Sequence, residues 1–419
     1  MLAAKARVRR SVVAAGVVTG LVVTAQPAFA HGGGDADLYV EPGESIQAAA
    51  DLAESGDTIR LAAGEFYEAV CIVGKGLTIV GAGRNKTTIL PPATAPSANE
   101  CWSLTPPPTA PGQPPEDGYS ALHFEDPDRR VTVTRLSTEG HPGSGIVAHG
   151  ATGFTVTNTS GTGHGLYGIL AAEGSTKIRI VNNIETGVEG PPTRPGGPPE
   201  SGTAGISIGD TGDAHAVVAH NKSTGWNLGI FAREARSGSI VGNTTSGNCI
   251  GVLVFDDSST ESLVPPVNFE GGDWRLIANK STANNRFCLA GPAGNQLVSG
   301  VGMALVNVDD VLVTANRIAD NSSIAPAPVP GQFPFPTAGL VVLSLPAFTP
   351  SPDGVPPGPA EDIKVIANRF SNNDLDIFEG AISVPIPGVP PTPPPVNITY
   401  IANSCTTSVP PTICGAPAV

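Results

Sequence analysis

A repeated pattern of glycine, alternating apolar residues and asparagine runs through most of this chain. Each unit opens on a glycine, has apolar residues at the first and third positions after it, and closes on an asparagine. The opening glycines are Gly168, Gly205, Gly229, Gly251, Gly302 and Gly339. The closing asparagines are Asn182 or Asn183, Asn221, Asn243, Asn279, Asn316, Asn368 and Asn403. Asn221 and Asn243 are 22 residues apart, and a period in the low twenties with short β-rich runs is typical of a solenoid.

The apolar positions of each unit alternate as they do in a β-strand, so we expect them to point inward. At the first position stand Ile169, Ile206, Ile230, Val252, Met303 and Leu340. At the third position stand Ala171, Ile208, Ala232, Val254, Leu305 and Val342. Coils of such a solenoid stack about 4.8 Å apart, so equivalent residues form columns. We expect the closing asparagines to form a buried structural ladder that satisfies its own amides and the turn backbone.

The first 30 residues have the pattern of a secretory signal peptide. A basic start precedes the apolar run Ser11–Ala25, and the small residues of Ala28–Ala30 mark a cleavage site before His31. The basic residues are Lys5, Arg7, Arg9 and Arg10. The run is too short and glycine-broken for a membrane anchor, and the ordinary secretory route is favoured over twin-arginine export. We therefore predict cleavage after Ala30 and a secreted, extracellular chain with no membrane span.

The mature chain is strongly acidic. Residues 31–419 carry 19 basic and 37 acidic side chains, a net charge of −18 with neutral histidines. Such a chain repels nucleic acid and anionic lipid, so neither is an expected partner. A polyanionic substrate would need a divalent cation to bridge it to the protein. We expect the protein to be a monomer.

All six cysteines lie outside the signal peptide, and an even count in an exported chain predicts three disulfides. They are Cys71, Cys101, Cys249, Cys288, Cys405 and Cys414. The sequence leaves the pairing open, and pairing of nearest neighbours is the simplest arrangement. Cys405 and Cys414 would close a short C-terminal loop. The pair Cys249–Cys288 is less secure, because these residues occupy different positions within consecutive repeats.

Residues 44–89 carry a resemblance to a known superfamily. Ser45 is a helix N-cap before the amphipathic segment 46–53, and short strands are expected at 58–61, 69–73, 77–81 and 88–90. The stretch ESIQAAADLAESGDTIRLAAGEFYEAVCIVGKGLTIVGAGRNKTTI resembles the first coil of the pectin-lyase-like, right-handed parallel β-helix superfamily. In that superfamily a small helix plugs the open end, followed by a Gly-Asp-Thr-Ile strand and a Gly-x-Phe/Tyr-x-Glu corner. The resemblance implies one all-β domain over residues 31–419, a right-handed parallel β-helix with an N-terminal capping helix.

Proline-rich inserts interrupt the repeats. They span 91–118, 187–202, 258–272, 322–338, 345–360 and 381–396. Proline lacks a backbone donor and does not fit a central strand, so these segments are expected as loops outside the solenoid. Loops that recur at corresponding corners could wall a groove. The tail after Asn403 is expected to cover the second open end of the solenoid.

An acidic column is the strongest candidate for chemistry. The fifth residue after the repeat glycine is acidic in four successive units, Glu173, Asp210, Glu234 and Asp256, and Asn307 and Ser344 follow. Structural turn residues are the favoured interpretation, since Asp and similar residues bond local backbone. A Ca²⁺ site remains open, with Asp210, Asp213, Asp256 and Asp257 as candidate ligands. Catalytic carboxylates also remain open, because one-coil spacing lies near that of glycosidase pairs.

Arg233, beside Glu234, is a weak catalytic candidate, because lyases of this fold use a basic proton abstractor beside Ca²⁺. The favoured interpretation is that Arg233 forms an ordinary surface ion pair. Gly163-His164-Gly165 resembles a motif of polygalacturonase-type hydrolases, but their Asn-Thr-Asp and Arg-Ile-Lys motifs are missing, so their catalytic residues are not carried over. The other histidines form no metal or triad pattern in sequence; they are His31, His123, His141, His149, His215 and His220. Trp102, Trp226 and Trp274 are favoured as loop anchors over exposed sugar platforms.

Two functions therefore remain open. The first is an exported β-helix protein that binds, or cleaves as a lyase or glycoside hydrolase, an extracellular polysaccharide, with Ca²⁺ as a candidate cofactor. The second is a non-enzymatic structural or cell-surface interaction protein that uses the solenoid as a rigid rod. An enzyme should place the acidic column in an open cleft, whereas a rod should bury it in turns.

Overall fold

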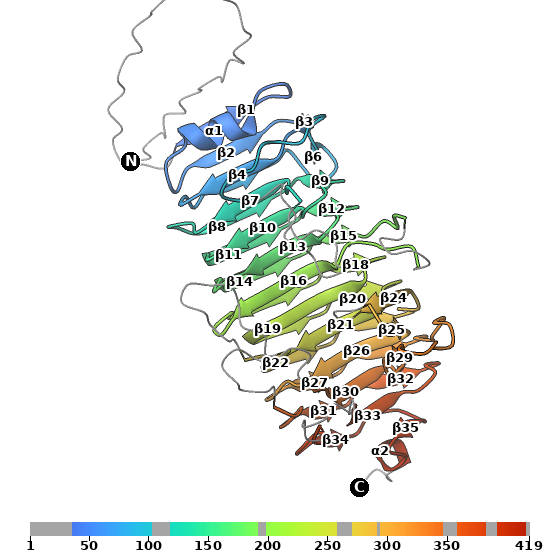
Figure 1. Ribbon diagram of the computed structural model, residues 1–419. Coiled ribbons are helices and arrows are strands. Elements are labelled where there is room, and N and C mark those ends of the chain that lie inside the picture. The colour runs from blue at the N-terminus through green and yellow to red at the C-terminus, as the bar shows by residue number, and fades with distance from the viewer. Residues whose placement is uncertain are drawn as a thin grey trace, which may run out of the picture.

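The chain folds as a right-handed parallel β-helix, as predicted (Figure 1). The computed structural model describes residues 36–102, 118–191, 198–257, 270–290, 294–346, 358–382 and 392–415. The predicted signal peptide lies outside the described residues. The first and last described elements, β1 and α2, lie at opposite ends of the stack of coils. No helix within the described ranges is long and apolar enough to cross a membrane.

Each coil contributes a strand to up to three parallel sheets, which we call front, back and side. The front sheet contains β4 (Val70–Val73), β7 (Leu122–Glu125), β10 (Ile146–His149), β13 (Tyr167–Ala172), β16 (Ala204–Thr211), the first half of β19 (Leu228–Val241), β21 (Ile250–Phe255), β26 (Val301–Val306), β30 (Leu340–Ser344), β33 (Ile377–Ala381) and β35 (Ser408–Val409). The back sheet contains β1 (Asp37–Val40), β2 (Thr58–Leu61), β5 (Thr78–Val80), β8 (Val131–Thr134), β11 (Thr152–Thr157), β14 (Thr176–Val181), β17 (Ala216–Ala219), the second half of β19, β22 (Gly272–Ile277), β27 (Leu312–Thr314), β31 (Lys364–Ile366) and β34 (Thr399–Ile401). Because β19 runs from the front sheet into the back sheet, the two are joined as one 22-stranded sheet.

The side sheet has ten strands and closes the third face of the solenoid. It contains β3 (Gly64–Tyr67), β6 (Thr87–Leu90), β9 (Ser137–Glu139), β12 (Ser160–Thr162), β15 (Ile184–Thr186), β18 (Lys222–Thr224), β20 (Thr244–Ser246), β23 (Lys280–Thr282), β28 (Arg317–Ala319) and β32 (Arg369–Ser371). A small separate sheet is built from β24 (Phe287–Ala290), β25 (Gln296–Ser299) and β29 (Phe333–Pro334). The strand β29 lies inside the predicted insert 322–338, which is therefore not wholly loop.

The predicted inward columns form the core. Ile169 pairs in register with Ile206, and the column continues through Ile230, Val252, Met303 and Leu340. Every residue of this column is at most 1% exposed. The second predicted column, from Ala171 to Val342, is buried in the same core. Burying such a side chain contributes roughly 1.5–3 kcal/mol, so the columns are a main source of stability.

The asparagine ladder is present at the turn between the back and side sheets, and it begins at Asn183 rather than Asn182. The side-chain oxygen of Asn221 accepts hydrogen bonds from the backbone nitrogen (2.8 Å) and the side-chain nitrogen (3.0 Å) of Asn183. The same arrangement links Asn221, Asn243, Asn279, Asn316, Asn368 and Asn403. The residue before each ladder asparagine has a left-handed backbone, as Asn182 does with a φ of 60°.

A second ladder, which the repeat analysis did not predict, lies at the turn that follows the side sheet. It runs through Asn248, Asn284, Asn321 and Asn373, whose side-chain amides bond one another at 2.9 to 3.1 Å. Both turns of the side sheet therefore carry stacked amides that leave few polar groups unpaired.

The two ends of the solenoid are covered as expected. Helix α1 (Ile46–Leu52) begins after the N-cap Ser45, whose hydroxyl accepts a hydrogen bond from the Ala48 backbone (3.0 Å). Its Ile46 and Ala49 are fully buried. At the other end, α2 (Thr412–Gly415) follows β35, and Ile413 and Cys414 pack against the core. These elements cover apolar surface that the first and last coils would otherwise expose.

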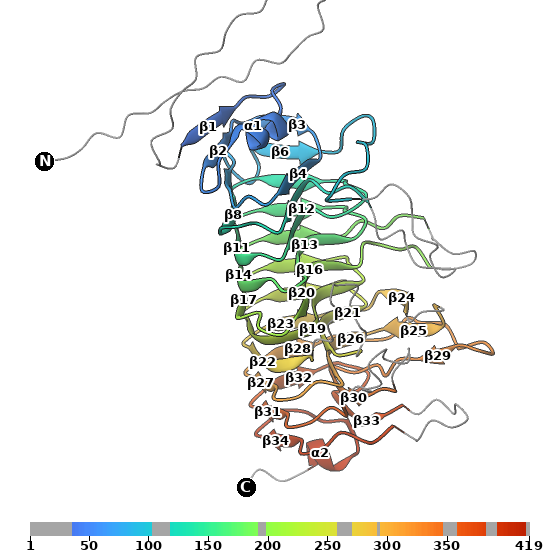
Figure 2. The same ribbon diagram turned by 60° about the vertical axis from the view of Figure 1, so that its left-hand side comes forward.

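The three disulfides join nearest neighbours, which confirms the simplest prediction. They are Cys71–Cys101, Cys249–Cys288 and Cys405–Cys414. The inserts leave the solenoid on the two sides of the front sheet. Residues 187–202 lead from β15 into β16, whereas residues 258–272 follow β21 and residues 345–360 follow β30. Figure 2 shows the small sheet of β24, β25 and β29 projecting from one side of the stack.

Candidate functional site

Charged side chains line the edge of the front sheet where its strands end. Because the strands are parallel, their carboxyl ends meet along one edge. We call these residues the charged row: Glu125, His149, Glu173, Asp210, Arg233 and Asp257. Glu125 and His149 end β7 and β10, and Glu173 follows β13. Asp210 and Arg233 lie in β16 and β19, and Asp257 follows β21. The row therefore takes one residue from each of six successive coils.

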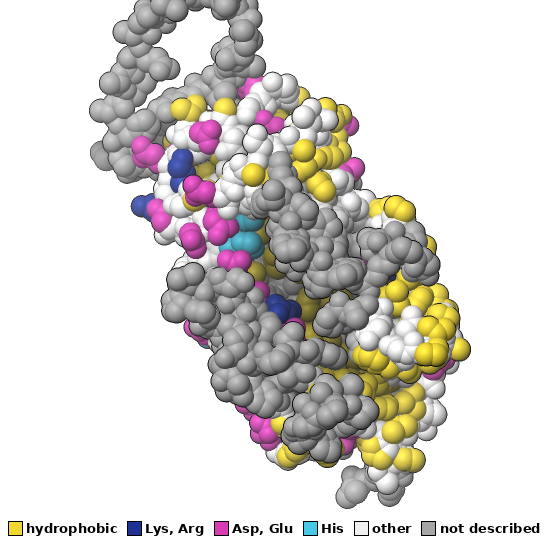
Figure 3. All heavy atoms as spheres, in the orientation of Figure 1, with side chains coloured by type: hydrophobic (Ala, Val, Ile, Leu, Met, Phe, Trp, Pro, Cys, Tyr) yellow, Lys and Arg dark blue, Asp and Glu magenta, His cyan; other side chains and the backbone are white. Residues whose placement is uncertain are grey.

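Each carboxylate of the charged row lies beside a histidine or an arginine of the row. His149 Nδ1 lies 3.2 Å from Glu125 Oε2 and 3.6 Å from Glu173 Oε1. Arg233 Nη1 lies 2.8 Å from Asp210 Oδ1, and Arg233 Nη2 lies 3.3 Å from Asp257 Oδ1. The side chains of the row are between 16% and 42% exposed, so a ligand can reach them. Figure 3 shows histidine, acidic and basic side chains along a hollow on this face.

The acidic column predicted from the repeats divides into two environments. Glu173, Asp210 and Glu234 adopt left-handed turns, with φ values of 53°, 52° and 45°. Glu173 and Asp210 are partly exposed, whereas the Glu234 side chain is fully buried. Asp256 is buried and accepts a hydrogen bond from the Gly271 backbone (3.0 Å). Only the first two acids of the column therefore belong to the accessible row.

The residues proposed as Ca²⁺ ligands do not converge on one point within the described residues. Arg233 lies between Asp210 and Asp257 and bonds both. Asp213 instead pairs with the exposed His215, whose Nε2 lies 2.9 Å from its carboxylate. The guanidinium of Arg233 supplies positive charge between two of the candidate Ca²⁺ ligands, Asp210 and Asp257.

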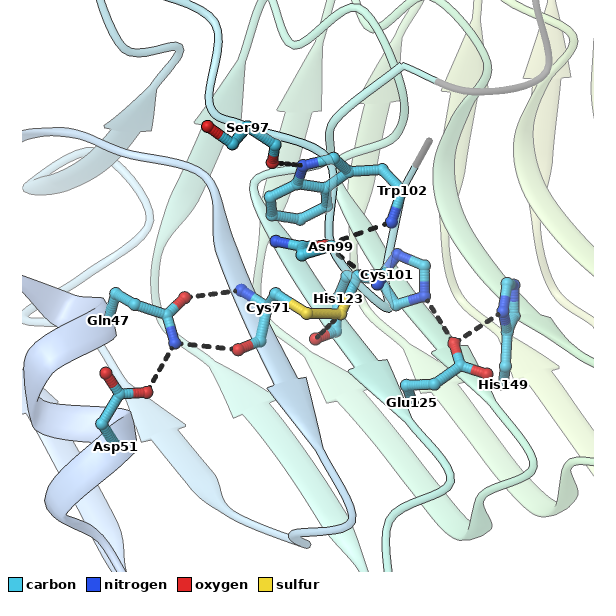
Figure 4. The surroundings of a disulfide bond; sticks show 10 residues. All are labelled: Gln47, Asp51, Cys71, Ser97, Asn99, Cys101, Trp102, His123, Glu125 and His149. Atoms are coloured by element: carbon cyan, nitrogen blue, oxygen red, sulfur yellow. Dashed lines mark hydrogen bonds and ion pairs between the residues drawn. A yellow bond between two sulfur atoms is a disulfide. The ribbon is translucent and has the colours of Figure 1, made fainter. Parts of the chain in front are cut away.

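A cluster of three donors at the start of the row was not recognised from the sequence. His123 Nε2 lies 3.0 Å from Glu125 Oε2, the same oxygen that His149 Nδ1 approaches (Figure 4). The His123 and His149 rings meet edge to face with centroids 4.8 Å apart. His123 and Glu125 are two residues apart in one strand and so share its outer face. The parallel register places His149 beside Glu125 in the next coil.

The two histidines and Glu125 shift one another's protonation. Burial would raise the pKa of Glu125, but hydrogen bonds and charge from His123 and His149 outweigh it and lower the pKa to about 2. Burial lowers the pKa of His123. Burial would also lower the pKa of His149, but the hydrogen bond to Glu125 and the charges of Glu173, Glu125 and Asp210 raise it. At neutral pH the cluster thus combines a carboxylate with a neutral imidazole.

The described part of the first insert, residues 91–102, is anchored beside this cluster (Figure 4). The disulfide Cys71–Cys101 anchors the insert to β4, and the Gln47 side chain bonds both backbone groups of Cys71, at 2.8 and 2.9 Å. Trp102 is brought against His123, with ring centroids 6.5 Å apart. Trp102 is 5% exposed and Trp226 and Trp274 are fully buried, so all three tryptophans anchor structure and none offers an open platform.

The outer face of the front sheet is closed in its C-terminal half. Phe231, Leu253 and Val341 pack there with residues of the inserts and the small sheet, including Val298 and Phe335. This second apolar cluster also contains the Cys249–Cys288 disulfide. Val147 and Ser207, on the outer face of the N-terminal half, are also only 2% exposed, so the accessible part of the sheet is the edge that carries the charged row.

His164 of the Gly163-His164-Gly165 motif points into the solenoid, away from the charged row. Its Nε2 lies 2.9 Å from the Thr138 hydroxyl, and its Nδ1 accepts a hydrogen bond from the His141 backbone (3.2 Å). Burial lowers the pKa of His164 to about 3, with a smaller contribution from His141. A neutral, fully bonded histidine is consistent with a packing role.

Comparison with known proteins supports the fold. No protein-family model and no curated protein matches this chain. The A-module of mannuronan C-5 epimerase AlgE4 from Azotobacter vinelandii matches 87% of this chain and 94% of its own, with 13% identity and a TM-score of 0.51. The AlgE6 A-module of the same organism covers 89% of this chain and 95% of its own, at 14% identity and a TM-score of 0.47. A mannuronic acid specific polysaccharide family 6 lyase from human gut microbiota covers 87% and 83%, at 11% identity and a TM-score of 0.42. The chain thus shares the parallel β-helix fold of the AlgE4 A-module.

Proposed function

We propose that this protein is exported and binds an extracellular polysaccharide along the charged row at the edge of its front sheet. The observation that carries the proposal is the charged row, a line of partly exposed carboxylates and cations with one residue per coil. Its spacing of about 4.8 Å along the solenoid presents hydrogen-bonding groups at regular intervals to an extended polymer. The AlgE4 A-module, which has the same fold, is named for an activity on mannuronan, a polysaccharide.

The composition of the row favours a polysaccharide with little negative charge. Four carboxylates face one arginine and one histidine, so the row itself repels a polyuronate. A polyuronate would need a bridging cation such as Ca²⁺. The described tryptophans are buried, so binding would depend on hydrogen bonds to sugar hydroxyls more than on stacking.

The same residues make cleavage a testable extension of binding. Glu173 and Asp210 stand one coil apart, which places their backbones about 4.8 Å apart, close to the separation of the carboxyl groups in retaining glycosidases. Arg233 holds Asp210 by an ion pair, whereas Glu173 faces His149. Two carboxylates in different surroundings are a requirement for acid–base division of labour.

A panel of soluble neutral and acidic polysaccharides tests this function with residues 31–419 of the chain. Affinity electrophoresis measures binding, new reducing ends measure hydrolysis, and absorbance of unsaturated uronates measures lyase activity, each with and without Ca²⁺. We expect retardation by at least one neutral polysaccharide. Absence of both binding and products across the panel would contradict the proposal and favour the non-enzymatic rod.

A further inference from the structure

We propose that His123, Glu125 and His149 bind one divalent transition-metal ion of the zinc class. Glu125 and His149 also belong to the charged row, but the metal site is argued from the donor geometry and does not rest on the polysaccharide function. The three side chains each offer one donor atom, and the three atoms all lie within 4.8 Å of one another. Within the described residues this is the one group of three or more His, Cys, Asp or Glu with that convergence.

The donor atoms are close to the spacing that a metal requires. His123 Nε2 and His149 Nδ1 approach the same carboxylate oxygen, Glu125 Oε2, at 3.0 and 3.2 Å. Tetrahedral zinc with ligand bonds of about 2.0–2.1 Å separates neighbouring donors by roughly 3.3 Å. Two of the three separations are thus near their final values, and a bound ion replaces the protons now shared between the rings and the carboxylate. Closing the third needs the two rings to turn toward each other.

The donor set selects the metal. Two imidazole nitrogens with one carboxylate suit zinc and its neighbours in the first transition row, whereas Ca²⁺ and Mg²⁺ prefer oxygen ligands. Three protein ligands leave a further position for water or a ligand, as in catalytic zinc sites. Glu173, whose Oε1 lies 3.6 Å from His149 Nδ1, stands beside the cluster and can accept a hydrogen bond from such a water.

The surroundings hold the ligands in place before a metal binds. All three stand on strands of the front sheet, in the parallel register of β7 and β10. Trp102 packs against His123 and is fixed by the Cys71–Cys101 disulfide and by its own indole hydrogen bond to the Ser97 carbonyl (3.2 Å). Ligands on rigid elements, supported by neighbouring residues, lose little entropy on binding.

Titration calorimetry with ZnCl₂ tests the site on residues 31–419 of the chain, freed of any histidine tag and stripped with a chelator. We expect one ion per chain and a rise in melting temperature. His149→Ala and Glu125→Gln should each weaken binding by more than about 100-fold, beyond the loss of an outer hydrogen-bond partner. His215→Ala is the matched control. Among the described residues, His215 pairs with a single carboxylate, that of Asp213 at 2.9 Å, and so belongs to no group of three donors.

Cobalt substitution gives a second measurement that does not depend on the stability of a variant. The unmodified chain should show visible d–d bands of a low-symmetry Co²⁺ site, and the isosteric Glu125→Gln variant should lack them. Circular dichroism confirms that each variant is folded. Failure of the unmodified chain to bind Zn²⁺ saturably, or equal binding by all variants, would overturn the proposal. The polysaccharide assays do not enter this test, so either proposal can fail alone.

Discussion

Two stacks of polar residues run along this solenoid, and they differ in what repeats. The asparagine ladder uses one residue type in seven consecutive coils; its first six members are buried, and successive side chains bond one another. The charged row changes residue at almost every coil and stays partly exposed. The hydrogen bonds of the turn backbone are sufficient to explain a stack made of one residue type. A stack whose residues differ from coil to coil is not explained by stacking and can have another role, such as ligand binding.

We expect the largest loss of stability from a variant that interrupts the asparagine ladder. In Asn243→Ala, the backbone and side-chain nitrogens of Asn221 lose their acceptor, at 2.9 and 3.0 Å, and the Val218 carbonyl loses its donor. Each buried group left unpaired costs about 1–3 kcal/mol, so we expect the free energy of unfolding to fall by about 3–5 kcal/mol. Denaturant unfolding followed by circular dichroism measures it.

Asn182→Ala is the matched control for the ladder. Asn182 is exposed beside Asn183, and the equivalent left-handed position holds alanine in four later coils, at Ala278, Ala315, Ala367 and Ala402. We expect a loss below about 1 kcal/mol. Similar losses in the two variants would mean that the ladder contributes no more than an ordinary turn residue.

We expect an effect of intermediate size on stability from the buried His164. Unlike the ladder asparagines, this buried side chain can take up a proton, so its contribution depends on pH. The folded-state pKa of His164 is about 3, below its unfolded value of about 6.5. Between these values the unfolded chain binds a proton that the folded chain does not, so stability falls as pH drops below about 6.5. From pH 7 to pH 5 this amounts to about 2 kcal/mol.

His164→Gln separates this contribution from other titrating groups. Burial also lowers the pKa of the neighbouring His141, whose ring centroid lies 5.8 Å away, so part of the pH dependence will remain. Buried Glu185 acts in the opposite direction, since its raised pKa favours the folded state at low pH. Unfolding measured at pH 7 and pH 5 should show a smaller difference in the variant. An unchanged difference would place the titration elsewhere.

We expect substitutions in the charged row to change stability least and polysaccharide binding most. Arg233→Lys keeps a positive charge near the fully buried Glu234 carboxylate, 3.9 Å from Arg233, but loses the planar group that bonds Asp210 and Asp257 together. Partly exposed pairs of this kind contribute about 1 kcal/mol or less. We expect polysaccharide retardation to weaken about 10-fold, the equivalent of 1.4 kcal/mol. Arg317→Lys, at an exposed arginine of the side sheet, should change neither property. Lost stability with unchanged binding would make the row a structural stack like the ladder.

The period of the repeat predicts the parts of the fold that depend on repetition. The inward columns follow from alternation, and the ladder from the recurring asparagine. The second ladder had an equally plain signal, because Asn248, Asn284, Asn321 and Asn373 each stand five residues after a member of the first. That spacing had no interpretation until the turn on the far side of the side sheet was known.

The candidate site was harder to predict because its key residues precede the clear repeats. His123 and Glu125 belong to an early, divergent coil, so aligning the repeat glycines could not bring them beside His149. The strand register does so, and the histidines therefore showed no pattern in sequence. The different burial of Glu173 and Glu234 depends on how neighbouring coils and inserts cover each corner, which the repeat alone does not encode.

The caps at the two ends have a consequence for resistance to proteases. Each coil of a solenoid contacts only its neighbours, so an interior coil loses two interfaces when it opens, whereas a terminal coil loses one and opens more easily. The rate of irreversible loss, including digestion by proteases, then depends on how often a terminal coil detaches. Helix α1 at one end and the Cys405–Cys414 loop at the other would slow detachment of the terminal coils and so set this rate.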